Sequence, residues 1–189
     1  MRGRGAAAFV SSGLHDYTVV LDADSDWGGP SVSELAQDLS AQFACPVLSV
    51  AVHDDDVTYY ELWNAGEHRD TYDSTPSFSD PEKRGPPEGG NATELVRLIG
   101  REACDEAVVE RILRAAHGMG GPNTYLFEHE RHAALIAALG LPDNAAGFGY
   151  RYLAASISDG RPLSTEFEST GVPYQEPKFE PLNIVVGWE

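Results

Sequence analysis

The sequence predicts a single α+β domain, 1–189, in which a mostly antiparallel sheet is covered by helices on one face. Its 189 residues are a usual length for one domain. A three-stranded meander is expected at about residues 47–73. The expected elements follow the order strand, helix, meander, helices, strand, which lacks the regular alternation of a doubly wound parallel sheet.

The first part of the chain predicts a leader, a strand and a helix. Residues 1–15 are rich in Gly, Ala and Ser and indicate a loose leader. The β-branched and apolar residues 17–21 predict a strand. A helix is expected to begin at Ser31, because Glu34 completes a capping box and apolar residues recur on one helical face as far as Phe43.

The meander is the clearest structural signal. Residues 47–52 predict a largely buried strand, residues 57–63 a second and residues 67–72 a third. Turns are expected at His53–Asp56 and at Asn64–Gly66, where the glycine can take the positive φ that a short hairpin loop requires. The third strand is polar, which is typical of an exposed edge strand.

The segment after the meander, residues 74–90, holds four prolines and three glycines and predicts a long loop within the domain. Helix caps, glycine stops and apolar spacing predict the elements that follow. These are a helix from Asn91 to Ile99, a helix from Cys104 to His117 stopped by Gly118, a helix from Asn123 or Thr124 to Leu139 stopped by Gly140, a strand from Phe148 to Ile157, an irregular tail from Gly160 to Pro181, and a last strand or strap from Leu182 to Trp188.

The charge balance excludes two function classes. The chain has 30 acidic and 13 basic residues and a formal net charge of −17. Most of this excess lies in residues 1–95. A chain of this charge is poorly suited to binding nucleic-acid phosphates or an anionic membrane. We therefore expect no direct nucleic-acid binding and no membrane association, and we expect any charged partner to be basic.

Cysteine usage and hydropathy indicate a cytoplasmic protein without a resident cofactor. Cys45 and Cys104 have no C-x-x-C spacing, which excludes a disulfide scaffold and a cysteine-based zinc module, although one bridge between them stays open. The apolar stretch 6–10 is shorter than an export signal needs. The sequence contains no apolar run of the roughly 20 residues that a membrane span requires.

The tip of the first hairpin is a candidate partner-binding site. Asp54, Asp55 and Asp56 bring three carboxylates together there, and Tyr59 and Trp63 share one face of the following strand. Aromatic side chains ringed by acids are suited to a basic protein partner. For the carboxylates two alternatives remain open: Asp54 and Asp56 act as cation ligands or a general base, or all three belong to a solvated turn. For Tyr59 and Trp63 the alternative is that helices or loops cover both faces of the sheet.

A second candidate is a metal site on the last helix. His129 and His132 lie three residues apart and Glu128 lies four before His132, so all three are neighbours on a helix. A further ligand such as His117 or Asp105 would complete the site. This spacing differs from the zincin motif, and half-buried structural histidines are the alternative interpretation.

A third acidic segment resembles the opening of a calcium loop. Asp22, Asp24 and Asp26 place oxygens at alternate positions. However, Trp27 stands where such a loop needs glycine, and Ser33 where it needs a bidentate glutamate. An acidic turn is the simpler interpretation.

The sequence favours a non-enzymatic function. It has no G-x-S-x-G nucleophile elbow, and the glycines at 118–121 lack the residues of a phosphate-binding loop. We expect an acidic protein-binding module of the immunity or inhibitor type that neutralises a basic partner. The alternative is a metal-dependent hydrolase using His129 and His132, with Glu128 or Glu130 as proton acceptor. A nucleic-acid mimic fits less well, because the acidic residues are mixed with many basic ones.

Overall fold

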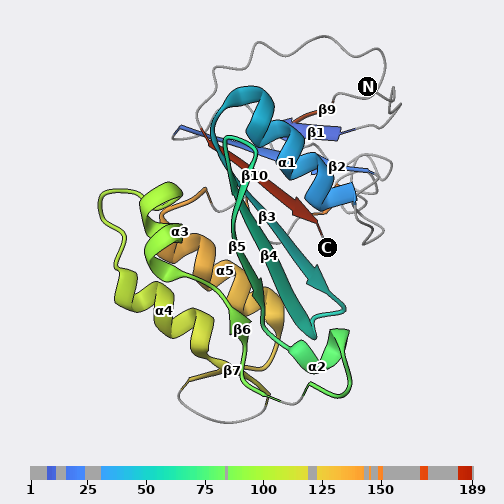
Figure 1. Ribbon diagram of the computed structural model, residues 1–189, viewed down its shortest axis with the longest axis vertical. Coiled ribbons are helices and arrows are strands. Elements are labelled where there is room, and N and C mark those ends of the chain that lie inside the picture. The colour runs from blue at the N-terminus through green and yellow to red at the C-terminus, as the bar shows by residue number, and fades with distance from the viewer. Residues whose placement is uncertain are drawn as a thin grey trace.

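The computed structural model has the predicted α+β class. It describes residues 8–11, 16–23, 31–83, 85–118, 123–142, 145, 149–150, 167–169 and 183–188. In this part of the chain, an eight-stranded sheet and a separate two-stranded sheet are combined with five helices (Figure 1). The expected single domain with a mostly antiparallel sheet is therefore confirmed.

The strands of the large sheet are β1 (Ala8–Ser11), β2 (Tyr17–Asp22), β3 (Pro46–His53), β4 (Val57–Asn64), β5 (Glu67–Asp73), β6 (Glu88–Gly89), β9 (Phe167–Ser169) and β10 (Asn183–Trp188). Their spatial order is β6-β5-β4-β3-β10-β2-β1-β9. The small sheet pairs β7 (Ala116–His117) with β8 (Thr124–Tyr125). The helices are α1 (Ser31–Phe43), α2 (Pro76–Ser79), α3 (Ala92–Leu98), α4 (Glu106–Arg114) and α5 (Glu128–Leu139).

The expected meander is confirmed as β3, β4 and β5, joined in antiparallel register. Its two turns use left-handed backbone, with Asp54 and Asp55 at φ 48° and 63° in the first and Gly66 at φ 81° in the second. Short polar residues tolerate this conformation, and glycine adopts it freely. A Cβ on Gly66 would also lie 2.8 Å from that of Ala41, so glycine lets this turn pass close to α1.

Strand β10 turns the sheet into a mixed one. It lies between β2 and β3 and runs parallel to both, with Ile184 opposite Thr18 on one side and Val47 on the other. The sequence predicts either a strand or a strap at residues 182–188, and the structure has a strand there. A parallel neighbour is reached only through a long connection, so local turn patterns do not reveal the pairing.

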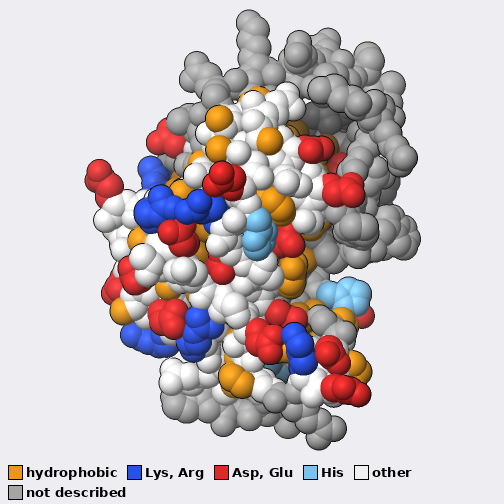
Figure 2. All heavy atoms as spheres, in the orientation of Figure 1, with side chains coloured by type: hydrophobic (Ala, Val, Ile, Leu, Met, Phe, Trp, Pro, Cys, Tyr) orange, Lys and Arg blue, Asp and Glu red, His pale blue; other side chains and the backbone are white. Residues whose placement is uncertain are grey.

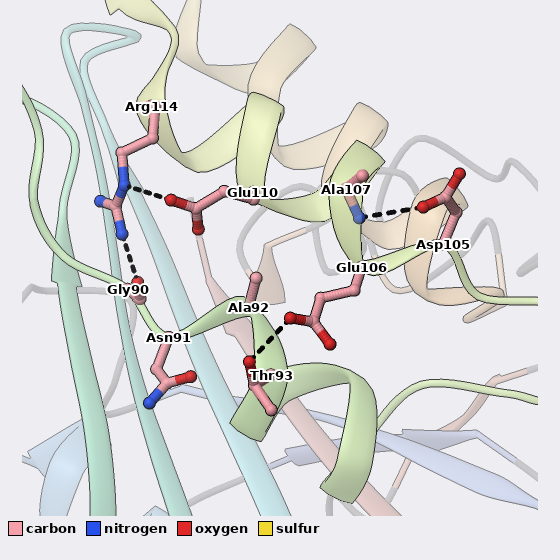
Figure 3. A pocket seen from close by; sticks show the side chains of 9 residues that line it. All are labelled: Gly90, Asn91, Ala92, Thr93, Asp105, Glu106, Ala107, Glu110 and Arg114. Carbon is pink, nitrogen blue, oxygen red and sulfur yellow. Dashed lines mark hydrogen bonds and ion pairs between the residues drawn. The ribbon is translucent and has the colours of Figure 1, made fainter.

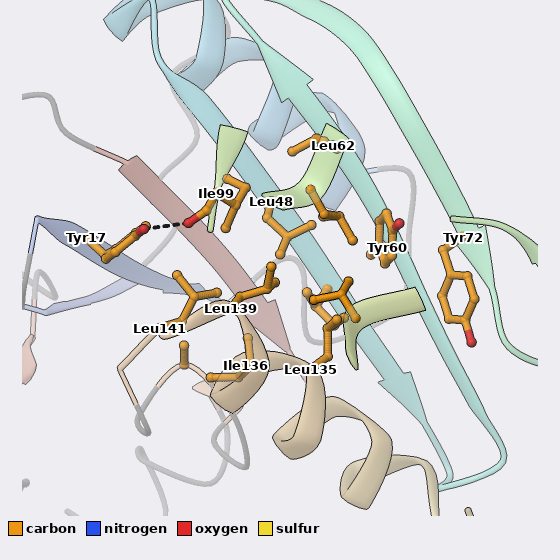
Figure 4. Close-up of a cluster of buried hydrophobic side chains, with 14 of the residues drawn as sticks. Tyr17, Leu48, Tyr60, Leu62, Tyr72, Ile99, Leu135, Ile136, Leu139 and Leu141 are labelled. Carbon is orange, nitrogen blue, oxygen red and sulfur yellow. Dashed lines mark hydrogen bonds between the residues drawn. The ribbon is translucent and has the colours of Figure 1, made fainter. Parts of the chain in front are cut away.

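Helices cover both faces of the sheet. On one face α3, α4 and α5 enclose a core that includes Leu48, Tyr60 and Leu135 (Figure 4). On the other face α1 covers a second cluster, which contains Val47 and Trp63. Successive residues of β3 point to opposite faces and nearly all are buried, so cover is required on both sides. The helical layer expected on one face therefore corresponds to α3–α5, and α1 adds a second layer.

Several boundaries differ from the predicted ones. Part of the expected leader forms β1, which pairs with β2 and β9. The expected loop 74–90 contains α2 and β6. Helix α4 ends at Arg114 instead of continuing to His117, because the backbone becomes extended at Ala115 and enters β7. The strand expected at 148–157 and the tail at 160–181 lie largely outside the described residues.

Candidate functional site

The three carboxylates of the β3–β4 turn have different surroundings. The side chain of Asp54 is 79% exposed and lies 3.5 Å from the half-exposed ring of His53. Asp56 is also exposed, and its backbone N–H donates to the carbonyl of His53 at 3.0 Å, which closes the turn. Asp55 instead points toward helix α5. Two of the three predicted partner-binding aspartates are therefore open to solvent.

Asp55 caps the N-terminus of α5. The helix's own N-cap residue, Phe127, has no side-chain oxygen, and the carboxylate Oδ1 of Asp55 accepts from the backbone N–H of His129 at 2.9 Å. The His129 ring Nδ1 lies 2.8 Å from both carboxylate oxygens. Burial raises the pKa of Asp55, but the backbone and ring hydrogen bonds of His129 outweigh it and hold the pKa below its ordinary value. The side chain of Asp55 therefore joins the turn directly to the start of α5.

Glu128 belongs to a buried ion-pair cluster. It is fully buried, and its carboxylate accepts from Arg131 Nε at 2.7 Å and lies 3.0 Å from His117 Nδ1. Arg131 also donates to the carbonyl of Ile112 at 2.7 Å, and its guanidinium lies 4.9 Å from the centre of the Tyr125 ring. These contacts use both oxygens of Glu128 and compensate its charge.

The structure separates the roles of the predicted metal ligands. His129 is paired with Asp55, Glu128 with Arg131, and the predicted further ligand Asp105 caps α4 by accepting from the backbone of Ala107. Among the described residues, no group of three or more His, Cys, Asp or Glu side chains is placed to hold a metal ion.

His132 has an unusual environment. It is 3% exposed, and within the described part of the chain neither ring nitrogen has a hydrogen-bond partner. Burial lowers its pKa to about 4, because the charged ring would lose its hydration. The ring is therefore neutral near pH 7.

The aromatic residues predicted on β4 are occupied by a local network. Trp63 is 9% exposed, packs beneath α1 and donates from Nε1 to Glu61 Oε2 at 3.2 Å. Tyr59 is half-buried and donates from its hydroxyl to Glu61 Oε1 at 3.1 Å. Burial and the neighbouring Glu61 carboxylate raise the pKa of Tyr59 to about 12. Tyr59 and Trp63 therefore hold Glu61 in place and leave little open aromatic surface.

The exposed aromatic surface lies instead beside the β3–β4 turn. Phe78, Leu126 and Phe127 are the large hydrophobic side chains that the described residues leave exposed, at 46%, 47% and 44%. The Phe78 ring meets the His53 ring edge-on at 5.2 Å. The Phe127 ring stacks on the His129 ring at 5.6 Å.

We call this region the tip surface: His53, Asp54, Asp55, Asp56, Phe78, Leu126, Phe127 and His129. Figure 1 shows α2 beside the β3–β4 turn at one end of the molecule, and Figure 2 shows acidic, basic and hydrophobic side chains close together at that end. Sequence reasoning missed its hydrophobic residues. Phe78 stands in a proline-rich segment, and Leu126 and Phe127 fall within the helix predicted from Asn123 or Thr124, where apolar residues suggest burial.

A polar hollow of about 790 Å³ lies between α3 and α4 (Figure 3). Its charged and polar lining groups bond to one another. Glu106 accepts from the Thr93 hydroxyl at 2.8 Å, and Glu110 accepts from Arg114 at 2.9 Å. Arg114 also donates to the carbonyl of Gly90 at 2.6 Å. Its carboxylates are therefore held by hydrogen bonds within the hollow, and one of them, Glu110, is also paired with a cation.

Known proteins give no guide to function. Comparisons with protein-family models, curated proteins and solved structures found no significant match. In the described ranges, every helix is too short or too polar to cross a membrane.

Proposed function

We propose that this chain is an acidic, non-enzymatic protein-binding module whose partner is a basic protein. The main support is uncompensated negative charge. Several bases at the surface are already paired, among them Lys83 with Glu88 at 3.0 Å and Arg97 with Glu94 at 2.6 Å. Since acids exceed bases by 17 in the whole chain, pairing of this kind leaves many carboxylates without a cation.

Such a charge distribution favours rapid capture of a basic partner. Long-range attraction raises association rates and falls as salt increases, whereas buried aromatic contacts slow dissociation. The tip surface supplies both kinds of group, because the exposed Asp54 and Asp56 lie beside the exposed rings of Phe78 and Phe127. This combination supports a binding function better than a catalytic one.

Within this class we favour an inhibitor or immunity-type protein that blocks the working surface of a basic partner, for example an enzyme that acts on nucleic acid. The acidic chain would then bind the protein and not the nucleic acid itself. A cytoplasmic setting is consistent with Cys45 and Cys104, which are both free thiols.

A metal-dependent hydrolase is the second candidate. The observation that favours it is His132, whose buried ring nitrogens have no partner among the described residues. Against it, Glu128 and His129 are already engaged by Arg131 and Asp55.

A column carrying the immobilised chain separates these functions. An extract of the source organism is loaded at low salt and eluted with a salt gradient. We expect a basic protein to be retained and then released by salt. A retained protein of neutral or acidic character, or release that does not depend on salt, would contradict the proposal. One metal ion per chain that disappears in His132→Ala would favour the hydrolase.

A further inference from the structure

We infer that the tip surface is the docking site for the basic partner, and that it receives a segment in which arginine or lysine alternates with apolar side chains. This inference rests on the proposed function and adds the place of binding and the chemistry of the segment bound.

Exposed hydrophobic area is concentrated at this place. In the described ranges, the large hydrophobic residues that are exposed are Phe78, Leu126 and Phe127, each between 44% and 47%. Scattered exposed hydrophobics are ordinary on protein surfaces, whereas a group gathered at one end is typical of an interaction site.

A chain of contacts joins the aromatic rings into one surface. Phe78 touches His53, which is paired with Asp54; across the turn, Asp55 holds His129, on which Phe127 stacks. Both rings therefore flank the same turn. A partner segment lying across it would contact aromatic side chains on each side of the carboxylates.

The surface is held in shape before any partner arrives. On one side Asp55 fixes the turn to α5. On the other, the segment that leads into α2 is fixed to the start of β4. Thr58 and Ser74 exchange hydrogen bonds of 2.8 and 2.9 Å, and the Thr75 hydroxyl donates to the carbonyl of Asp56 at 3.0 Å. A preorganised surface avoids much of the entropy cost of ordering on binding.

The charge around the rings selects a cationic partner. Asp54 and Asp56 are exposed on the turn, Glu82 is exposed near Phe78 in sequence, and Glu130 is exposed on the first turn of α5. The nearby Lys83 is already paired with Glu88. A guanidinium or ammonium group gains from both a carboxylate and an aromatic face, and its alkyl stem packs against the ring.

Two other surfaces are weaker candidates. The hollow between α3 and α4 has polar groups that satisfy one another and no exposed aromatic ring in its lining. On the β4 face, Trp63 is buried under α1 and Tyr59 is bound to Glu61. Neither combines open apolar area with uncompensated charge.

The test is an amide-resolved NMR titration of the full chain with a short synthetic peptide of alternating arginine and leucine. Two control peptides replace leucine with serine or arginine with glutamate. We expect the arginine–leucine peptide to bind most tightly, with shifts confined to the β3–β4 turn, α2 and the start of α5. Shifts spread over the whole acidic surface, or centred on the hollow between α3 and α4, would overturn the assignment.

Three double variants extend the test. The double variant Phe78→Ser/Phe127→Ser, whose side chains are exposed and should not be needed for folding, is expected to weaken peptide binding by about tenfold or more. Asp54→Asn/Asp56→Asn and the control Asp38→Asn/Glu102→Gln each remove two negative charges from exposed positions. We expect only the first charge pair to weaken binding strongly, and an equal effect of the two would overturn the assignment.

The experiments distinguish an error in the docking site from an error in the proposed function. If the column retains a basic protein and the tip-surface variants retain it equally well, the docking assignment is wrong while the proposed function stands. If the wild-type chain binds neither a basic protein nor the arginine–leucine peptide, both are wrong.

Discussion

The carboxylate of Asp55 caps helix α5 through the backbone N–H of His129, at 2.9 Å and across 74 positions of sequence. The backbone carbonyl of Asp55 adds a second contact by accepting from the N–H of Glu128 at 3.1 Å. Helix starts need such acceptors because their first N–H groups have no partner within the helix. One turn residue therefore ties the start of α5 to the tip surface.

Removing the Asp55 side chain should destabilise the protein more than removing that of its neighbour. Asp54 and Asp55 both have positive φ, so glycine fits both positions without backbone strain. We expect Asp55→Gly to lower the free energy of unfolding by about 1 kcal/mol more than Asp54→Gly, the usual cost of losing a helix cap. Urea unfolding at pH 7 measures the difference. Equal stability of the two variants would show that the cap contributes nothing.

His132 should make stability depend on pH. Its ordinary pKa of 6.5 applies in the unfolded chain, whereas burial lowers the folded value to about 4. As pH falls below 6.5, the unfolded state gains a proton that the folded state does not, so stability is lost until pH reaches about 4. The full shift corresponds to about 3 kcal/mol.

The variant His132→Leu isolates this effect, since it keeps an apolar side chain of similar size. We expect the stability of the wild type relative to His132→Leu to fall as pH is lowered from 7 to 4. His68→Gln removes a histidine from an exposed position and is the matched control. Parallel pH profiles for the wild type and His132→Leu would contradict the burial of a neutral ring.

The buried pair of Arg131 and Glu128 should be costly to break. Both side chains are fully buried, so Arg131→Met leaves a carboxylate without its main partner and should lower stability by about 3 kcal/mol or more. Replacing both residues, as in Glu128→Leu/Arg131→Met, should recover a large part of that loss. Arg97→Met, which breaks an exposed pair with Glu94, should cost far less stability than Arg131→Met, because solvent screens an exposed ion pair. Similar losses for Arg131→Met and Arg97→Met in thermal or urea unfolding would refute this account.

Local sequence patterns predict the helices and strands that depend only on residues close together in the sequence. The meander follows from alternating apolar residues and turn chemistry, and Asn91 caps α3 by accepting from the N–H of Glu94 at 3.1 Å, as its spacing indicated. The predicted start of α5 is wrong. The sequence indicates Asn123 or Thr124 as the cap, whereas the helix begins at Glu128 because its capping carboxylate comes from a distant turn.

Part of the candidate site also follows from the local sequence, and part does not. The exposure of Asp54 and Asp56 follows from their place in a hairpin turn, which the sequence shows directly. The exposure of Phe78 and Phe127 depends on how α2 and α5 meet that turn, and the parallel insertion of β10 depends on residues more than a hundred positions apart. Neither leaves a local sequence signal.

The most direct test of the binding function is native mass spectrometry, at low salt, of the chain purified from its source organism, both as wild type and as Phe78→Ser/Phe127→Ser. We predict that the wild type carries a basic protein in a whole-number ratio, that added salt dissociates the complex, and that the double variant is recovered largely free. A wild type that carries a stoichiometric metal ion and no protein, or a variant that carries the same partner equally well, would contradict the account.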